Sequence, residues 1–387
     1  MGHPRALRRR PASRGPGLGP GIGPVTLPRL TVRWLRAVPV TVPMKHALGT
    51  SAATVRTAPV LLVDLETHQG VTGRAYQFCY RPAAAPAIVC FLDDILEAIT
   101  GAPLVPADLW SVLSKRYTLI GVQGIVRMAM ALVDVASWDA LAQAAGLPLV
   151  RLVGGIPRPV PAYNSNGLGL MRVDALADEA ERLLERGFRG VKLRLGYPTL
   201  EEDLAAVRAV RGRISDDIAL MVDYNQALTM AEAIRRARAL DEEGVYWIEE
   251  PIRHDDYAGC AQIAHAAATP VQIGENFSQV YDMEKALAAG ACDYVMPDLE
   301  RIGGVTGWQR ASALAAGAAV PLSSHLYPEV SAQLLAATPT AHWLEYVDWM
   351  TPLLAEPLRI VDGMAVIPDR PGNGLLWNPG AVRRYAA

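Results

Sequence analysis

The chain has 387 residues, which is long for one domain and predicts two. Hydrophobic residues make up 51% of it and charged residues 20%, with a formal net charge of −2. This balance is typical of a globular protein and argues against nucleic acid or a membrane surface as partner. No uninterrupted apolar run reaches transmembrane length. The four cysteines lack metal-type spacing, so we expect buried free thiols and a reducing, cytoplasmic location.

Residues 1–28 differ in composition from the rest of the chain. They carry five arginines among prolines and glycines and contain no apolar segment, which excludes a secretory signal. Pro and Gly at this density cannot build a core, so we predict a disordered tail. A tail that binds an acidic partner and an over-extended start of the reading frame are the alternatives.

Residues 29–157 have the pattern of a small α+β domain. Three alternating segments predict antiparallel strands, at 31–38, 60–67 and 71–76. Gln69-Gly70 is typical of a hairpin turn between the last two. The long segment from Met44 to Thr57, rich in Gly, Ala and Thr, predicts a lid loop. Helical periodicity follows from Pro86 to Gln143.

Residues 158–350 repeat one pattern, in which a short apolar run ends in a polar residue and a helical stretch follows. The runs have four to seven residues and predict buried strands at 160–163, 191–194, 219–225, 245–250, 271–276, 294–298, 320–325 and 342–345. Strands that alternate with helices form a parallel sheet, and eight of them suit a closed barrel. The expected fold is therefore α/β, a modified (β/α)8 TIM barrel with an α+β N-terminal capping domain. Residues 351–387 are expected to return to the capping domain.

Three carboxylates follow successive predicted barrel strands. Asp223, Glu249 and Glu275 are each separated from the next by 26 residues, the length of one strand–helix unit. Because the carboxyl ends of barrel strands surround one pocket, we expect these side chains to converge. Three facing acids would repel unless a cation shared the site. An all-oxygen set favours Mg2+ first and Mn2+ next, over Zn2+.

Candidate bases and acids end other strands. Lys192 and Arg194 end the second strand and, two residues apart, point the same way. Asp298 ends the sixth strand and His325 the seventh, and an Asp beside a His fixes its tautomer and raises its basicity. A lone His is more often structural, but with this Asp and a metal opposite we favour catalysis. Glu345, ending the eighth strand, could donate a proton to substrate if its pKa is raised.

Ordered motifs from about Leu30 to the C-terminus match one family. They are Ala131-Leu132-Val133-Asp134, Ser137-Trp138-Asp139-Ala140-Leu141, Leu152-Val153-Gly154-Gly155, Met221-Val222-Asp223-Tyr224-Asn225-Gln226, Trp247-Ile248-Glu249-Glu250-Pro251, Gly274-Glu275-Asn276, Met296-Pro297-Asp298, Ile302-Gly303-Gly304-Val305-Thr306-Gly307-Trp308, Ser323-Ser324-His325-Leu326 and Ala341-His342-Trp343-Leu344-Glu345. With these motifs the chain resembles the enolase superfamily, mandelate racemase subgroup.

The resemblance implies a homo-oligomeric enzyme that removes the α-proton of a small 2-hydroxy carboxylate with the help of a metal ion. The residues implied as Mg2+ ligands are Asp223, Glu249 and Glu275. Lys192 would neutralise the substrate carboxylate, and Glu345 would form a hydrogen bond to its other oxygen. Ser165 and Asn225 lie where the family places substrate and metal-shell contacts.

Arg194 departs from the family pattern. The second strand of the subgroup usually ends in Lys-x-Lys, whose second lysine is a base, whereas arginine stays protonated far above pH 7. Only His325 is then evident as a base, so we expect a one-base dehydratase of an acid sugar or another 2-hydroxy acid.

Two alternatives remain open. A racemase of an apolar 2-hydroxy acid is favoured by the residues that match the subgroup's apolar substrate cap, which are Leu48, Thr50, Ala52, Val55 and Tyr80. Such a cap leaves sugar hydroxyls unpaired, at about 1–3 kcal/mol each, unless Lys45, His46 or Arg56 points inward. A degenerate barrel that only binds is the other alternative.

Overall fold

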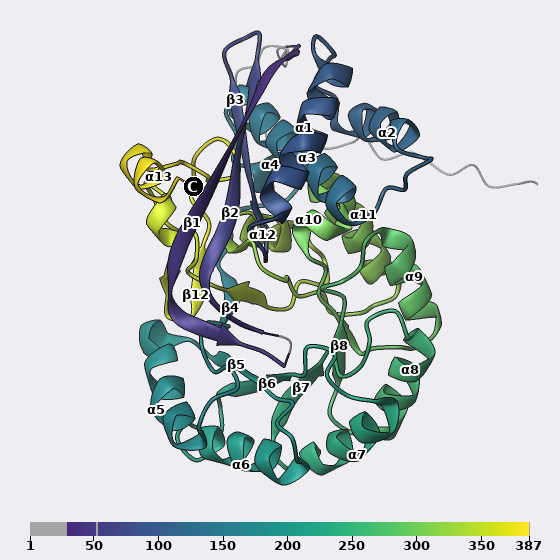
Figure 1. Cartoon of the computed structure of the whole chain (residues 1–387), viewed down its shortest axis with the longest axis vertical. Helices are drawn as coiled ribbons and strands as arrows, with labels where there is room; N and C mark the ends of the chain where they lie inside the picture. The colour runs from purple at the N-terminus through teal and green to yellow at the C-terminus, as the bar shows by residue number, and fades with distance from the viewer. Residues whose placement is uncertain (1–28, 52, 387) are drawn as a thin grey trace, which may run out of the picture.

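The computed structural model describes residues 29–51 and 53–386, which form a capping domain packed against a ring of strands and helices (Figure 1). The predicted disordered tail, residues 1–28, lies outside the described residues. One continuous hydrophobic core runs through both parts. Within the described residues, no helix combines the length and the apolar character needed to cross a membrane. The predicted fold class, a TIM-type barrel with an α+β cap, is confirmed.

The capping sheet is antiparallel, in the order β1 (Val32–Gly49), β2 (Thr54–Thr67) and β3 (Thr72–Phe78). The predicted turn at Gln69-Gly70 joins β2 to β3, and Gly70 has a φ of 79°, which L side chains rarely adopt. Helices α1 (Ala84–Ile99) and α3 (Gly124–Ala144) cover the sheet, and α2 (Pro106–Arg116) and α4 (Leu149–Leu152) pack against α3. The helical stretch predicted from Pro86 to Gln143 is therefore three separate helices. Turns that contain Gly101 and Gly121, both with positive φ, separate them.

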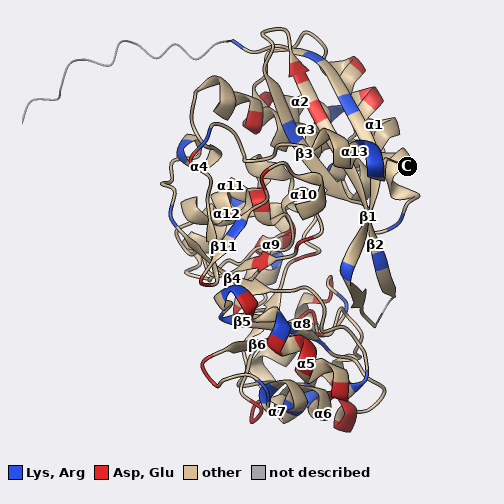
Figure 2. Ribbon diagram, turned by 90° about the vertical axis from the view of Figure 1, so that its left-hand side faces the viewer, with Lys and Arg blue, Asp and Glu red and all other residues tan. Residues whose placement is uncertain are grey.

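The lid loop predicted between Met44 and Thr57 is wrong, because both strands continue through it. β1 and β2 stay paired as far as Gly49 and Thr54. The Gly and Ala of this segment suggested a loop, whereas its β-branched Thr and Val residues suit a strand ladder. The hairpin reaches over the barrel (Figures 1 and 2), where the Leu170 N–H donates to the Gly49 carbonyl at 3.0 Å.

The barrel strands are parallel neighbours in chain order. They are β4 (Val160–Asn164), β5 (Gly190–Arg194), β6 (Ala219–Asp223), β7 (Val245–Glu249), β8 (Val271–Ile273), β9 (Tyr294–Val295) and β10 (Leu344–Tyr346), which pairs with β4. The predicted seventh strand, 320–325, is not a regular strand. It joins its neighbours only through single bridges, at Val295–Leu322, Leu322–Ala341 and Asp298–His325. Pro321 lacks the N–H needed for a regular ladder.

Helices surround the barrel between its strands. They are α5 (Val173–Leu183), α6 (Leu200–Arg211), α7 (Met230–Leu240), α8 (Tyr257–Ala266), α9 (Val280–Ala288), α10 (Leu299–Ile302), α11 (Gly304–Gly317) and α12 (Pro328–Ala337), with short 3-10 turns η1 (Glu185–Gly187) and η2 (Thr351–Leu353). Local sequence sets their starts. At α6, the Thr199 hydroxyl accepts from the Glu202 N–H, and the Glu202 carboxylate accepts from the Thr199 N–H.

The barrel interior is packed rather than open. Tyr163, Met221 and Trp247 are fully buried and form a cluster of their own inside the ring. The indole N–H of Trp247 donates to Glu249 Oε2 at 3.1 Å. This layer is the floor beneath the carboxyl ends of the strands, where the candidate site lies.

The C-terminal segment packs first on the barrel and then on the capping domain. Strands β11 (Arg359–Val361) and β12 (Met364–Val366) first form a hairpin that extends the barrel sheet at β4. The chain then reaches the capping domain, where the Trp377 indole donates to Asp64 at 2.8 Å and α13 (Pro379–Tyr385) packs on β1. The predicted return to the capping domain therefore follows an unpredicted hairpin on the barrel.

The cysteines are only partly as predicted. Cys79 and Cys260 are buried, whereas Cys90 is exposed and Cys292 is half-buried. Cys90 follows the apolar Ile88-Val89 in α1, but it lies on the outer face of that helix. Short-range composition did not reveal which helix face would be covered.

Candidate active site

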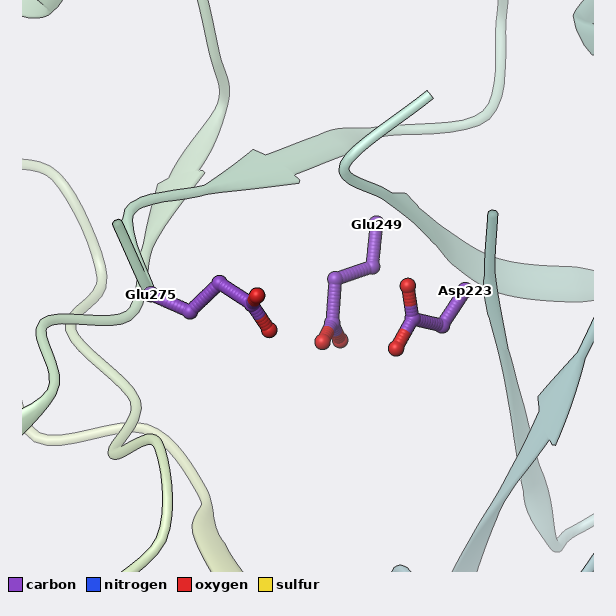
Figure 3. Close-up of side chains that lie close together, drawn as sticks. All are labelled: Asp223, Glu249 and Glu275. Atoms are coloured by element: carbon purple, nitrogen blue, oxygen red, sulfur yellow. The ribbon is translucent and has the colours of Figure 1, made fainter. Parts of the chain in front are cut away.

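Three carboxylates point into one space at the carboxyl ends of adjacent strands (Figure 3). Asp223 ends β6, Glu249 ends β7 and Glu275 follows β8. One oxygen of each lies within 4.8 Å of one from the others. Asp223 and Glu249 are partners in the parallel ladder, so their side chains project from the same side of the sheet. The predicted convergence is therefore present.

The surroundings of these acids fit a divalent cation. Asp223 and Glu249 are buried and Glu275 is half-buried. Burial raises the pKa of Glu249 well above its usual value, and Lys192 opposes this while Asp223 adds to it. Acids crowded in this way favour a shared cation. Because all the donors are carboxylate oxygens, Mg2+ or Mn2+ suits the set better than Zn2+.

Lys192 bridges the metal-type cluster and the far side of the pocket. Its Nζ lies 2.6 Å from Glu249 Oε1, 2.7 Å from Glu345 Oε1 and 3.4 Å from Asp223 Oδ2. Burial alone would lower the pKa of Lys192, but Glu249 and Glu345 outweigh it and raise the pKa well above its usual value. Lys192 is thus a fixed ammonium, suited to binding an anion.

Both carboxylate oxygens of Glu345 accept hydrogen bonds within the protein. Its Oε1 accepts from the Ser165 hydroxyl at 2.7 Å, and its Oε2 accepts from the Leu326 N–H at 2.8 Å. Burial favours the neutral acid, yet Lys192 and His325 outweigh it and hold the pKa of Glu345 below its usual range. The raised pKa that proton donation from Glu345 would require is not found here, and its role toward the substrate stays a prediction.

His325 and Asp298 form a close pair. His325 Nδ1 lies 2.7 Å from Asp298 Oδ2, while Asp298 Oδ1 accepts from the Glu300 and Arg301 N–H groups at the start of α10. With its proton on Nδ1, the ring presents Nε2 to the carboxylate cluster, 3.3 Å from Glu275 Oε2. Burial opposes the charged ring, but Glu275 and Asp298 outweigh it and raise the pKa of His325. The geometry is that of a base oriented by an acid.

Arg194 is held in place by the chain beside it. Its Nη1 donates to the carbonyls of Ser165 at 2.8 Å and Gly167 at 2.9 Å, and its Nη2 donates to the Ser165 hydroxyl at 2.9 Å. The hydroxyl in turn donates to Glu345. Arg194 lines the cavity, but two of its hydrogen bonds hold Ser165 and a third holds Gly167.

These groups line one cavity of about 510 Å³ between the barrel mouth and the β1–β2 hairpin. Of the predicted cap residues, the cavity wall includes Leu48, Thr50, Val55 and Tyr80, whereas Ala52 lies outside the described residues. Asn225 also lines it, and its amide nitrogen donates to Asp223 Oδ2 at 3.0 Å. Ser165 is placed behind the wall, in contact with Arg194 and Glu345.

Of the three basic residues considered for the cap, only one lines the cavity. Lys45 pairs with Asp348 at 3.3 Å and His46 with Glu179 at 2.9 Å, and neither lines the cavity. Arg56 does line it. Of the three residues that could have met sugar hydroxyls by pointing inward, Lys45 and His46 do not, because both side chains anchor the hairpin to the barrel.

Strained backbone marks the strand ends around the cavity. Asn225 and Gln226 have φ values of 47° and 65°, and Leu326 and Tyr327 have 50° and 51°. Left-handed residues other than Gly cost about 1–3 kcal/mol and cluster at functional sites. The two turns directly follow Asp223 and His325, so they fix where those side chains emerge.

Family models match both parts of the chain. One, described as the mandelate racemase / muconate lactonizing enzyme N-terminal domain, matches residues 32–154, and another, described as enolase C-terminal domain-like, matches residues 175–381. The chain belongs to the enolase superfamily. The predicted resemblance to its mandelate racemase subgroup is confirmed.

Individual relatives in the superfamily agree. The L-talarate/galactarate dehydratase of Salmonella typhimurium is 32% identical, over 84% of this chain and 82% of its own length. A solved enolase from alpha proteobacterium BAL199, with bound magnesium, is 44% identical with a TM-score of 0.91, covering 92% of this chain and all of its own. An enolase from Bradyrhizobium, complexed with magnesium and mandelic acid, is 40% identical with a TM-score of 0.88, covering 94% and 100%. This superfamily member is an enzyme of the metal-dependent lyase or racemase type.

One residue that supports the site of this superfamily member was not predicted. Arg301 donates from Nη1 to the Glu275 carbonyl at 2.9 Å and to Asn276 Oδ1 at 2.8 Å, and its guanidinium stacks on the Tyr80 ring at 4.9 Å. Arg301 therefore links Glu275, one of the three clustered carboxylates, to Tyr80 of the capping domain. Its place three residues after Asp298, in the short helix α10 that follows a barrel strand, was the available signal.

Proposed function

We propose that the chain is a Mg2+-dependent dehydratase of a 2,3-dihydroxy carboxylate, with His325 as its single base. The observation that carries the proposal is the contrast between the two flanks of the cavity. His325 is oriented by Asp298 and presents Nε2 to the carboxylate cluster, whereas Arg194 is bound to the backbone beside Ser165. The acid-sugar dehydratase among the relatives supports it.

Positively charged groups bind the substrate carboxylate. A Mg2+ ion bound by Asp223, Glu249 and Glu275 supplies positive charge that stabilises the negative charge developing on the substrate oxygens. Lys192 contributes its ammonium from the same side. Ser165 keeps Glu345 in position through a 2.7 Å hydrogen bond, so that Lys192 is aligned between two carboxylates.

His325 then carries one proton through the reaction. Its Nε2 lone pair takes the α-proton, and the C–H electron pair moves into the carboxylate to give the enolate. The electron pair of the enolate then forms a double bond between the α- and β-carbons while the bond from the β-carbon to its hydroxyl oxygen breaks. The imidazolium returns the proton to that oxygen, so water leaves and the base is restored. The resulting enol relaxes to a 2-keto acid. One base on one face requires the α-proton and the β-hydroxyl to leave from the same side.

Racemisation is the second candidate, because the Bradyrhizobium relative is complexed with mandelic acid, which has no β-hydroxyl. Inversion needs a base on each face. A guanidinium remains protonated at any pH at which the protein is folded, so Arg194 cannot remove a proton. The proposal therefore favours elimination.

Product analysis in D2O tests the proposal. The purified enzyme with Mg2+ is incubated with sugar acids and apolar 2-hydroxy acids, and products and recovered substrates are followed by NMR. We expect a 2-keto acid with deuterium at the former β-carbon and no inverted substrate. Recovery of only inverted, α-deuterated substrate would establish a racemase. No exchange with any acid would leave the degenerate barrel as the better account.

A further inference from the structure

The outer wall of the cavity carries two arginines that the proposed reaction does not use. Arg56 comes from β2 in the hairpin, and Arg81 follows β3. Both residues are exposed and line the cavity, and neither forms a hydrogen bond through its guanidinium or an ion pair with any residue that the structure describes. Figure 2 shows basic segments on both arms of the hairpin where it overhangs the barrel. The other basic residue in that part of the hairpin, Lys45, is already paired with Asp348.

Charge is distributed unevenly along the cavity. All the acids that line it, Asp223, Glu275 and Glu345, belong to the barrel, where Lys192, His325 and the expected cation face them. The part of the lining contributed by the cap includes no acid, so its two guanidinium groups are uncompensated. An anion at this end would form charge-assisted, bidentate hydrogen bonds.

Irregular backbone lies beside both arginines. The β1–β2 register is irregular between Pro43 and Leu48, and Arg56 lies on β2 opposite this irregular stretch. Such irregularities re-aim side chains beside active sites. Arg81 follows Tyr80, whose φ of 56° is strained and whose ring is held by Arg301. Both positions are thus shaped by departures from regular strand geometry.

We propose that Arg56 and Arg81 form a subsite for a second carboxylate, and that the substrate is a hydroxylated dicarboxylate. Its reacting carboxylate lies beside Lys192, and its far carboxylate meets the two guanidinium groups of the cap. Amide side chains of Asn225 and Gln226 line the wall and suit the hydroxyls of the carbon chain. This inference rests on the proposed function, because it names the acid on which the dehydratase acts.

Paired substrates test the subsite. Six-carbon sugar diacids are compared with the monoacids that share their C2 and C3 configuration, by kcat/KM with Mg2+ and by calorimetric binding to a His325→Asn variant. The binding arm does not depend on turnover. We expect diacids to be preferred, and Arg56→Gln or Arg81→Gln to lower the diacid-to-monoacid ratio about tenfold or more, mainly through KM. Arg33→Gln is the matched control, since Arg33 is an exposed arginine on β1 that does not line the cavity.

The outcomes separate the subsite from the reaction. Diacid preference that falls in both cavity variants, but not in Arg33→Gln, supports the subsite. Equal kcat/KM and equal affinity for diacids and monoacids would overturn it while leaving the dehydratase in place. A preference that survives both substitutions would also overturn it. If His325→Asn binds neither class of acid and the unaltered enzyme dehydrates neither, the proposed function fails, and the subsite fails with it.

Discussion

The two flanks of the cavity hold basic residues at equivalent strand ends, yet the chain uses them differently. The His325 ring is held at Nδ1 by Asp298, and its Nε2 is directed at the carboxylate cluster, 3.3 Å from Glu275 Oε2. Arg194 directs three hydrogen bonds at the loop after β4. A basic side chain at the barrel mouth can therefore act as a base only where one of its nitrogens can lose its proton near neutral pH. That nitrogen must also face the substrate site instead of the backbone.

The largest expected effect is on the His325 flank. His325→Asn removes the only ionisable nitrogen proposed to reach the α-proton, so dehydration should fall by about 100-fold to 10,000-fold. Product formation and α-proton exchange in D2O are measured together. His265→Asn, an exposed histidine on α8, is the control. Exchange that continues at the original rate would show that another group removes the proton.

The next effect concerns how Asp298 orients that ring. In Asp298→Asn the amide oxygen can still cap α10, but the amide N–H₂ group can only donate to Nδ1, which moves the ring proton to Nε2. We expect kcat to fall about 10- to 100-fold or more with little change in KM. A KM effect without a kcat effect would show that Asp298 acts only through the fold.

A smaller effect is expected on the Arg194 flank. Arg194→Met loses the hydrogen bonds that hold Ser165, so Glu345 is less well placed and dehydration should fall about tenfold. The configuration of recovered substrate should not change. A loss as large as that of His325→Asn, together with loss of inverted product, would make Arg194 a partner in racemisation.

The last prediction concerns stability rather than activity, and rests on Asp134, a buried acid behind the site that we expect to be neutral. Asp134 lies buried between α3 and α11, and its oxygens accept from the Thr306 N–H at 2.9 Å and hydroxyl at 2.5 Å. Burial, only partly opposed by these bonds, raises the pKa of Asp134 to about 7. Since the unfolded chain releases this proton near pH 4, its stabilising contribution is complete below that pH and is lost as pH rises through 7.

Urea unfolding between pH 4 and 8 measures this contribution. The free energy of unfolding should decline by up to about 1.4 kcal/mol per pH unit for this one group. Asp134→Asn should flatten the decline, whereas Asp93→Asn, at an exposed position on α1, should not. A curve that rises with pH in the same window, or that is unchanged in Asp134→Asn, would contradict the assignment of a neutral Asp134.

The spacing of polar residues along the sequence predicted which side chains meet at the carboxyl ends of the parallel strands. One carboxylate per strand–helix unit was enough to bring Asp223, Glu249 and Glu275 together, and strand ends placed Asp298 beside His325. These features depend only on strands meeting at one edge. Metal and catalytic roles for these residues, cytoplasmic location and a homo-oligomeric state remain predictions.

Features that depend on side-chain neighbours were not predictable in the same way. The ionisation of Glu345 is set by Lys192, which comes from a distant strand, and no local pattern reveals that contact. The hairpin at Met44–Thr57 was misassigned because its stability comes from pairing and from contact with the barrel. Arg56 emerges as a cavity residue only when the hairpin is placed over the mouth.

A crystal structure with Mg2+ and a slowly reacting dihydroxy acid tests the central claim most directly. The account predicts a cation bound by Asp223, Glu249 and Glu275, with the α-carbon of the acid facing His325 Nε2. It also predicts that the β-hydroxyl lies on that same face. A cation bound elsewhere, or an acid whose α-hydrogen faces Arg194, would contradict it.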